Sequence, residues 1–225
     1  MNILFCAYRD WAVDAYEEIK KRHPTLKMSL VKSEYEFYYN INEYVWPNII
    51  ILVGWSWIVP RNVVDNVYTI GFHPSNLPDY AGGSPIQHQI IDGITQTKGC
   101  LFRATSKLDM GPIIYKENLD LDGSMTNIFT SLSFCAVSLV DQFLNNFPDV
   151  PNIEQKAAPK TRKRLKPIDS KLTKEKIFNM SSKELYNFIR CREDPYPNVF
   201  LEDVSGKLYF KSVEFIPRNK DYSGE

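Results

Sequence analysis

The feature of the sequence that most constrains the fold is the continuous apolar run NIIILVG at residues 48–54. A strand that is apolar at every position is buried on both faces, and such strands are typical of parallel sheets. Pro47 and Gly54 bound the run and limit it to the length of a strand. The run therefore predicts an α/β fold with a central, mostly parallel sheet.

Shorter apolar runs recur along the first 150 residues and alternate with segments of helical spacing. Further strands are predicted at residues 2–7, 27–31, 67–72, 99–104 and 112–117. Helices are predicted after residue 10 and at residues 35–44, 85–93 and 125–147. This alternation predicts a Rossmann-like, doubly wound, mostly parallel sheet.

The pattern changes between residues 146 and 159, where proline and charged residues become frequent. We therefore predict a first domain at residues 1–150 and a smaller C-terminal extension at residues 151–225. The extension is expected to contain a linker, one helix at residues 181–190 and a β-hairpin whose strands meet at Ser205 and Gly206.

The chain has 27 Lys plus Arg and 27 Asp plus Glu, so its formal net charge is zero and nucleic acid is not an expected partner. The charge is unevenly spread, because residues 156–176 contain nine basic and two acidic side chains, an excess of nine minus two, or seven. Such a segment is typical either of a site for a small anion or of a solvated linker.

The N-terminal residues MNILFCAYRDW lack the basic and apolar regions of a signal peptide, and no eighteen apolar residues follow one another. A soluble, cytoplasmic protein without a membrane partner is therefore expected. The four cysteines occur singly within apolar segments, which predicts reduced, buried thiols and no metal site. The glycine motif of nicotinamide-dependent oxidoreductases does not follow the first strand, so that class is disfavoured.

One of the three histidines, His73, follows the predicted strand at residues 67–72 and opens a loop stiffened by Pro74 and Pro78. Ligands of open α/β sheets bind beyond the carboxyl ends of the strands, which favours catalysis by His73, although single loop histidines are also common on ordinary surfaces. Asp109 lies 36 positions further on (109 minus 73), in the turn KLDMGPII. An imidazole can stabilise an oxyanion and a carboxylate can take a proton, but sequence spacing does not bring the two together.

Three segments, in this order, resemble the folate-dependent formyltransferases: FHPSNLPDYAGGSPIQ, LDMGPII, and SSKELYNFIRCREDPYPNVF preceded by RKRLKPIDS. The resemblance extends from the first strand to about Phe215, and the last segment looks like that of enzymes acting on nucleotide-linked amino sugars and on methionyl-tRNA. The resemblance implies transfer of a formyl group from 10-formyltetrahydrofolate to a primary amine, with no metal required.

The resemblance also implies roles for single residues. His73 would stabilise the oxyanion, and Asp109 would orient His73 and accept the proton of the amine. The family's third catalytic residue, an asparagine two positions before the histidine, is replaced here by Gly71. Asn76 is the proposed substitute for the missing amide, and the alternative is that Asn76 only caps its loop.

The same resemblance implies two sets of binding residues. Those implied to hold the folate are Ser56, Trp57, Ile58, Ser106, Lys107 and Leu108. Those expected to contact the acceptor or its pyrophosphate are Ser75, Tyr80, Arg162, Lys163 and Arg164.

A nucleotide-linked amino sugar is the favoured acceptor, because purine-pathway relatives lack the C-terminal segment and methionyl-tRNA enzymes usually carry a longer basic barrel. The first choice is dTDP-4-amino-4,6-dideoxyglucose, whose formamido product enters the O-antigen of lipopolysaccharide. The alternatives are a 3-amino sugar, UDP-4-amino-4-deoxyarabinose, methionyl-tRNA, and a catalytically impaired protein that only binds folate or a nucleotide sugar. A homodimer is an open alternative to a monomer, since relatives are commonly dimers.

Overall fold

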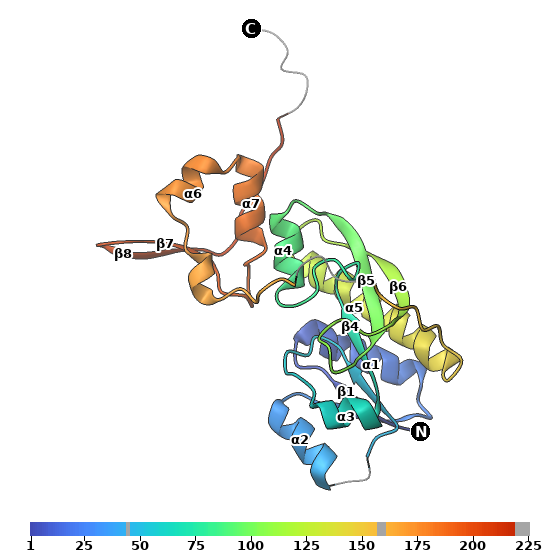
Figure 1. The fold of residues 1–225 in the computed structure, drawn as a ribbon. Helices are drawn as coiled ribbons and strands as arrows, with labels where there is room; N and C mark the ends of the chain where they lie inside the picture. Colours follow the sequence, from blue (N-terminus) through green and yellow to red (C-terminus); the bar gives the residue numbers. More distant parts are fainter. Residues whose placement is uncertain (44–45, 157–160, 219–225) are drawn as a thin grey trace.

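The computed structural model describes residues 1–43, 46–156 and 161–218. A sheet of six strands forms its first part, which is shown in Figure 1. The strands are β1 (Asn2–Cys6), β2 (Lys27–Val31), β3 (Ile49–Leu52), β4 (Tyr68–His73), β5 (Gln96–Arg103) and β6 (Ile113–Asp120). They lie in the order β2-β1-β3-β4-β5-β6, and β1 to β4 pair in parallel. The prediction of a Rossmann-like, mostly parallel sheet is confirmed.

The last two strands depart from the parallel pattern. β5 pairs antiparallel with β4, so that His73 lies opposite Cys100, and β6 pairs antiparallel with β5. The chain leaves β4 at the carboxyl edge of the sheet, forms a loop and the helix α4 (Pro85–Ile91), and enters β5 from that same edge. The loop after His73 therefore stays beside the carboxyl edge.

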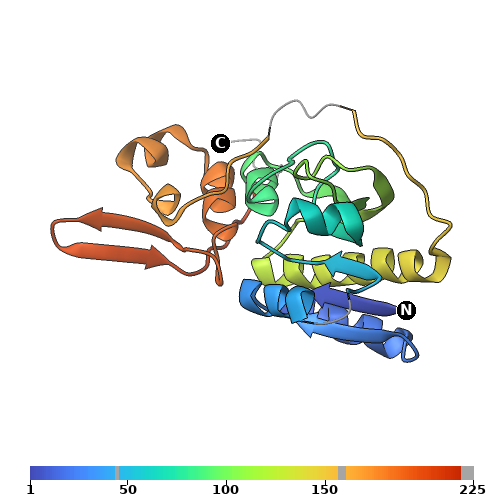
Figure 2. The same ribbon diagram turned by 60° about the horizontal axis from the view of Figure 1, so that its bottom comes forward.

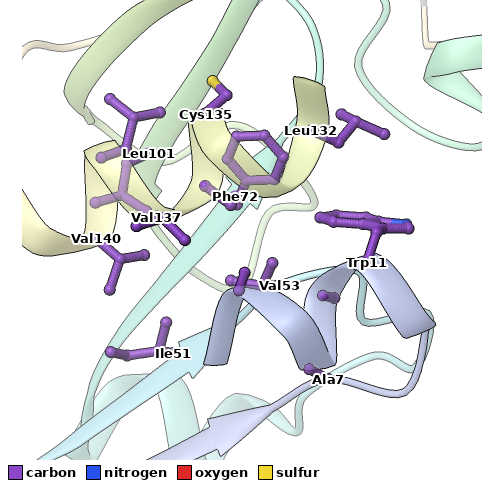
Figure 3. Close-up of a cluster of buried hydrophobic side chains, with 14 of the residues drawn as sticks. Ala7, Trp11, Ile51, Val53, Phe72, Leu101, Leu132, Cys135, Val137 and Val140 are labelled. Atoms are coloured by element: carbon purple, nitrogen blue, oxygen red, sulfur yellow. The ribbon is translucent and has the colours of Figure 1, made fainter. Parts of the chain in front are cut away.

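Successive strand residues point to opposite sides of the sheet, so apolar strands present apolar side chains on both faces. Helices cover both of these faces. The helices of this part, besides α4, are α1 (Asp10–Arg22), α2 (Glu34–Glu43), α3 (Arg61–Asn66) and α5 (Met125–Asn146). Figure 3 shows part of the larger core cluster, which includes Ile51 of β3, Trp11 of α1 and Val140 of α5. The neighbouring Ile50 packs on the other face with Phe37 of α2. The end of the predicted helix at residues 35–44 lies outside the described residues.

The long helix α5 begins at a capping box. Ser124 Oγ accepts a hydrogen bond from Asn127 N, and Asn127 Oδ1 accepts one from Ser124 N. By length and composition α5 is apolar enough to cross a membrane. Half of its most apolar stretch, 50%, is buried inside the structure, where α5 packs on α1, β5 and β6. A core helix packed on a sheet passes the same test, so the composition of α5 follows from its place in the core.

The C-terminal extension holds more helix than the single one predicted at residues 181–190. Its elements are the 3-10 helix η1 (Pro167–Ser170), α6 (Lys174–Asn179), α7 (Ser182–Arg190), β7 (Val199–Asp203) and β8 (Gly206–Phe210). Sequence patterns miss α6 because none of its six residues is buried, so no apolar stripe marks it. The hairpin β7–β8 projects away from the rest of the chain in both views (Figures 1 and 2).

Two contacts attach α7 and the turn after it to the start of α5. Arg190 is 1% exposed and donates through Nη1 to the carbonyl oxygens of Leu121 and Gly123, both at 2.9 Å. Glu193 Oε2 accepts a hydrogen bond from Met125 N at 3.1 Å. The extension is therefore anchored by buried polar contacts next to the carboxyl edge of the sheet.

The stretch predicted to be a linker pairs with the first part of the chain at two points. Ile153 forms an antiparallel bridge with Ile113 of β6, and Arg162 forms a parallel bridge with Gly82 in the histidine loop. Residues 157–160, within the same stretch, lie outside the described residues. A domain boundary at residue 150 stays a prediction, since the chain beyond it continues to contact the sheet.

Candidate active site

The candidate active site lies at the carboxyl edge of the sheet, where three parallel strands end side by side. β1 ends at Cys6, β3 at Leu52 and β4 at His73, and β3 pairs with both of the others. Each of these strands runs into a segment that carries polar or aromatic side chains. This edge is where ligands bind in open α/β sheets.

The fold brings His73 and Asp109 together at this edge. His73 Nδ1 lies 3.7 Å from Asp109 Oδ2, and the two side chains are only 8% and 12% exposed. His73 Nε2 lies 3.0 Å from the carbonyl oxygen of Tyr80, and because a carbonyl oxygen only accepts, Nε2 carries a hydrogen and donates it. The other ring nitrogen therefore faces the carboxylate. A pair of this kind can hold or move a proton in a site largely shielded from water.

The turn that carries Asp109 is held in place from two sides. Asp109 adopts a φ of 54°, in the left-handed region that aspartate tolerates better than most residues. Asp109 Oδ2 accepts a hydrogen bond from Gly82 N at 2.9 Å. Gln155 Nε2 donates to the carbonyl oxygens of Asp109, at 2.9 Å, and of Gly111, at 2.6 Å. The carboxylate is thus positioned by the histidine loop and by the chain beyond α5.

Sequence reasoning did not find Gln155. It is one uncharged residue in a segment rich in proline and charge, and no local pattern distinguishes it from its neighbours. Its side-chain oxygen, Oε1, is buried and has no hydrogen-bond partner within the described residues. Only the return of the chain along β6, which pairs Ile153 with Ile113, brings Gln155 to the Asp109 turn.

The residues after β3, predicted to hold folate, form an aromatic cluster with the end of β1. Tyr8 Oη and Ser56 Oγ lie 2.6 Å apart. The ring centroid of Trp57 lies 4.8 Å from that of Tyr8 and 4.6 Å from that of Trp55. Ile58, the next residue, is 79% exposed. The segment therefore places an apolar side chain at the surface beside a rigid aromatic group.

The loop before Asp109 is the second segment predicted to hold folate. Ser106, Lys107 and Leu108 are all exposed, and Leu108 is exposed at 59%. The backbone N–H of Lys107 donates to Thr105 Oγ1 at 3.3 Å, which closes a short turn. Leu108 thus presents an apolar surface directly before Asp109.

The predicted acceptor residues in the histidine loop differ in exposure. Ser75 is fully buried and its Oγ donates to the carbonyl oxygen of Asp79 at 2.6 Å, so its hydroxyl shapes the loop. Its contact with an acceptor stays a prediction. Tyr80 is half-buried, and its hydroxyl donates to Asp92 Oδ2 at 2.8 Å. Partial burial and this hydrogen bond raise the pKa of Tyr80 to about 12.

Asn76 lies on the outer side of the same loop. Its side chain is exposed, and Oδ1 accepts a hydrogen bond from Lys116 Nζ at 2.8 Å. Asn76 and Tyr80 border a hollow of about 560 Å³ beside the start of β5, whose lining does not include His73 or Asp109. The role of Asn76 as an oxyanion donor stays a prediction.

The basic residues 162–164 lie against the histidine loop instead of crossing open solvent. Arg162 N donates to Ala81 O and Gly83 N donates to Arg162 O, both at 2.8 Å. The close approach requires glycine, because a Cβ at Gly82 or at Gly83 would collide with the backbone of Arg162 or of Arg164. The two glycines therefore allow the backbone of residues 162–164 to pack directly against the histidine loop.

The three basic side chains differ in what they contact. The Arg162 guanidinium pairs with Asp92 Oδ2 at 2.7 Å and lies over the Tyr80 ring, 5.0 Å from its centroid. Its contact with a pyrophosphate stays a prediction. The carbonyl oxygen of Lys163 accepts a hydrogen bond from His88 Nε2 at 2.9 Å, and the Lys163 side chain is exposed. Arg164 is also exposed.

The position of the missing asparagine, Gly71, is occupied by a neighbouring ring. Gly71 and Phe102 are paired residues of β4 and β5. Two ring atoms of Phe102 would lie 2.9 Å from a Cβ at Gly71, closer than real Cβ contacts. Phe102 is 6% exposed and packs with Leu77 and Cys100. A side chain at position 71 therefore needs a change at position 102.

No group of three or more His, Cys, Asp or Glu side chains in the described ranges is arranged to hold a metal ion. Among known families, the one described as formyl transferase matches residues 20–128. Among curated relatives, the methionyl-tRNA formyltransferase of Campylobacter lari is 27% identical over 176 residues, which are 77% of this chain and 55% of that protein. The chain spans about half the length of the curated relatives it matches.

Solved structures share the fold over nearly the whole chain. A methionyl-tRNA formyltransferase from Clostridium thermocellum is 25% identical, with a TM-score of 0.86 over 98% of this chain and 95% of that chain. A sugar N-formyltransferase from Shewanella sp. is 15% identical, with a TM-score of 0.72 over 96% and 99%. HypX from Aquifex aeolicus in complex with tetrahydrofolic acid is 19% identical, with a TM-score of 0.76 over 90% and 36%. The resemblance to the formyl transferase family is therefore supported by the family match at residues 20–128 and by a shared fold over nearly the whole chain.

Proposed function

We propose that the chain transfers the formyl group of 10-formyltetrahydrofolate to the primary amine of a nucleotide-linked amino sugar. The observation that carries the proposal is the His73–Asp109 pair, in which Nδ1 and Oδ2 lie 3.7 Å apart at the carboxyl edge of the sheet. A neutral amine that gains an acyl group must lose a proton, and a carboxylate beside an imidazole is suited to receive it.

In the proposed reaction, the amine nitrogen forms a bond to the formyl carbon while the bond from that carbon to the folate nitrogen breaks. Because the hydrogen on His73 Nε2 is donated to the carbonyl oxygen of Tyr80, His73 stabilises the negative charge on the formyl oxygen through a hydrogen carried on Nδ1, the nitrogen that faces Asp109. Asp109 accepts the proton that the amine loses, and the departing folate nitrogen gains a proton. Burial of both side chains strengthens these electrostatic interactions, since little water screens them.

The proposed folate site lies between the segment after β3 and the loop before Asp109. Both segments expose an apolar side chain, Ile58 at 79% and Leu108 at 59%, which suits the flat ring system of a pterin. Ser56 and Trp57 are held by contacts with Tyr8, and Ser106 and Lys107 are exposed. The HypX structure with tetrahydrofolic acid, which has the same fold, supports folate as the ligand.

Replacing Gln155 by alanine is expected to lower kcat about tenfold to a hundredfold, because the Asp109 turn loses two hydrogen bonds and its carboxylate is displaced. Steady-state kinetics would measure kcat and KM separately. Gln155→Glu is the matched variant, since it keeps the size of the side chain and removes the donor. A merely structural role predicts lower thermal stability with unchanged kcat of the folded fraction, and that result would contradict positioning of Asp109.

We propose that Asn76 donates a hydrogen bond to the oxyanion. Two substitutions separate this role from a structural role in the histidine loop. Asn76→Asp keeps an acceptor for Lys116 Nζ and removes the amide donor, whereas Asn76→Ala removes both. Loss of an oxyanion donor is expected to lower kcat about a hundredfold or more in both variants. If only Asn76→Ala lowers kcat, Asn76 acts through Lys116 and the loop.

The preference for a nucleotide-linked sugar rests on charge and size. The net charge of zero disfavours a long polyanion, whereas the basic residues near the histidine loop suit a short one. Within this class we propose dTDP-4-amino-4,6-dideoxyglucose, with O-antigen synthesis, a cytoplasmic location and a homodimer as parts of the same proposal.

Methionyl-tRNA is the second candidate acceptor. It is favoured by the names of the curated relatives and by the Clostridium thermocellum structure, whose TM-score of 0.86 is the highest of those described above. Both candidates present a primary amine on a molecule that also carries phosphate. The chemistry assigned to His73 and Asp109 is therefore the same for either.

The test of the function is formyl transfer from 10-formyltetrahydrofolate to four acceptors in separate reactions, followed by mass spectrometry. The acceptors are dTDP-4-amino-4,6-dideoxyglucose, its 3-amino isomer, UDP-4-amino-4-deoxyarabinose and methionyl-tRNA, with the Asp109→Asn protein as the control. Formylation of one sugar supports the proposal, and formylation of methionyl-tRNA alone replaces it by the second candidate. Absence of any product, with folate still bound, supports a binding protein without catalysis.

A further inference from the structure

Tyr80 adopts a backbone conformation that few residues with a side chain adopt. It lies in the histidine loop, between His73 and the paired glycines, and its φ is 56°, in the left-handed region. This conformation is unfavourable for a bulky aromatic residue and persists only where several contacts impose it. Strained residues of this kind gather at functional sites, and the contacts of Tyr80 lead directly to His73.

The carbonyl oxygen of Tyr80 holds the His73 ring in place. It lies 3.0 Å from His73 Nε2 and accepts the hydrogen of that nitrogen. This hydrogen bond fixes the orientation of the ring and leaves Nδ1 facing Asp109 Oδ2, 3.7 Å away. If the carbonyl pointed elsewhere, the ring would be free to rotate or to move its hydrogen from one nitrogen to the other. One backbone oxygen therefore decides which nitrogen is presented to the reaction.

The backbone on both sides of Tyr80 is held by hydrogen bonds. Before Tyr80, the carbonyl oxygen of Asp79 accepts a hydrogen bond from Ser75 Oγ at 2.6 Å. After Tyr80, the carbonyl oxygen of Ala81 accepts one from Arg162 N at 2.8 Å. A change of φ at Tyr80 would rotate the segment after it relative to the segment before it. The positive φ and the direction of the Tyr80 carbonyl are therefore maintained together.

The side chain of Tyr80 is held by an aspartate and an arginine from two other segments. Its hydroxyl donates to Oδ2 of Asp92, the residue that follows α4, at 2.8 Å. The same oxygen accepts a hydrogen bond from Arg162 Nη2 at 2.7 Å. The guanidinium carbon of Arg162 lies 5.0 Å from the centroid of the Tyr80 ring. The three side chains thus contact one another in a closed set, which we call the Tyr80–Asp92–Arg162 clamp.

We propose that Asp92 and Arg162 are positioning residues for His73, because they hold Tyr80 in its left-handed conformation and so keep its carbonyl oxygen on His73 Nε2. The inference rests on the proposed function, in which His73 Nδ1 serves the oxyanion. The side chains of Asp92 and Arg162 are 35% and 40% exposed, and an ion pair as exposed as this contributes little to overall stability. The effect of the clamp is therefore local. The sequence did not suggest a role for Asp92, which lies 19 positions after His73 (92 minus 73).

The ¹⁵N NMR signals of the His73 ring test the inference without any formyl transfer. The chain has three histidines, and His73→Gln identifies the signals of His73 by their loss. In the wild type, Nε2 is expected to have the chemical shift of a nitrogen that carries a hydrogen. In Asp92→Ala and in Tyr80→Phe, this signal is expected to shift toward that of a nitrogen without hydrogen, since the carbonyl no longer holds the hydrogen on Nε2. Asp65→Ala and Tyr209→Phe change exposed side chains on α3 and β8, and these controls should leave the signal unchanged.

Steady-state kinetics gives the second measurement. Asp92→Ala and Tyr80→Phe are each expected to lower kcat about tenfold to a hundredfold with little change in KM, because the His73 ring is no longer held in its reactive orientation. Asp92→Asn keeps an acceptor for the Tyr80 hydroxyl, so its kcat should lie between those of Asp92→Ala and the wild type. The melting temperatures of all three variants should stay near that of the wild type. A raised KM with an unchanged kcat and an unchanged Nε2 signal would overturn the proposal, since Tyr80 would then act by contacting the acceptor.

The NMR signal distinguishes failure of this inference from failure of the proposed function. If no acceptor is formylated but the Nε2 signal depends on Asp92, the clamp stands and the proposed function is wrong. If an acceptor is formylated and the Nε2 signal is the same in Asp92→Ala, Tyr80→Phe and the wild type, the function stands and the clamp has no role in it. If Asp92→Ala does not fold, Tyr80→Phe, which removes only one oxygen atom, decides the same question.

Discussion

Replacing Asp109 by asparagine is expected to lower kcat of formyl transfer about a hundredfold to ten-thousandfold, the range typical for loss of a general base. The substitution is chosen so that the backbone survives, because asparagine tolerates the φ of 54° found at this position. Its side-chain oxygen can still accept the hydrogen bond from Gly82 N, at 2.9 Å in the native structure. Only the carboxylate facing His73 Nδ1 is lost.

Single-turnover kinetics with saturating donor and acceptor would measure this effect on the chemical step. Thermal unfolding is the accompanying measurement, and the melting temperature of Asp109→Asn should stay near that of the wild type. Asp65→Asn is the control, since Asp65 is an exposed carboxylate on α3 that pairs with Arg61 at 3.2 Å. A kcat for Asp109→Asn within threefold of the wild-type value (roughly 0.6 kcal/mol) would remove Asp109 from the proposed mechanism.

Restoring the family's asparagine with Gly71→Asn is expected to destabilise the protein by about 1–3 kcal/mol and to lower turnover, not to raise it. Two ring atoms of Phe102 lie 2.9 Å from the position of the new Cβ, and Phe102 is 6% exposed in a packed cluster. The ring belongs to β5, which pairs with β4 at this point, so it must turn within a packed cluster to make room. Urea denaturation would give the free energy of unfolding.

The double variant Gly71→Asn/Phe102→Ala is the informative companion. Phe102→Ala alone should cost about 3–5 kcal/mol through the cavity it leaves. The asparagine would fill part of that cavity, so the double variant is expected to be more stable than the sum of the single effects predicts, by about 0.5–3 kcal/mol. If Gly71→Asn alone kept wild-type stability and raised kcat, the ring would not be the obstacle that the geometry indicates.

The packing at position 71 also explains how the fold accommodates glycine where the family has asparagine. A glycine and a phenylalanine face one another across β4 and β5, so the two positions form one packing unit. The sequence shows the glycine as a missing amide, but it does not show which side chain occupies the space. The large ring of Phe102 on the neighbouring strand fills the space that glycine, which has no side chain, leaves free.

The sequence by itself determined the six strands of the first 150 residues and four of their helices, because buried faces give a periodic apolar pattern. It did not predict the short helix α3 or the antiparallel pairing of β5 and β6. Continuous apolar runs marked the parallel strands, and the run before His73 placed that residue at a carboxyl edge. The motifs around His73 and Asp109 indicated the resemblance to formyltransferases that the family match at residues 20–128 supports. The helix α6 has no buried residues and therefore no apolar stripe, so the sequence pattern did not predict it.

Only the tertiary structure decided which side chains meet. The 3.7 Å contact of His73 with Asp109 and the support of that turn by Gln155 each join residues distant in sequence. Such contacts depend on how the whole core places the strands and loops. The local spacing of apolar residues along the sequence therefore cannot predict them. The same holds for Arg162, whose charge pairs with Asp92 because the basic segment packs on the histidine loop.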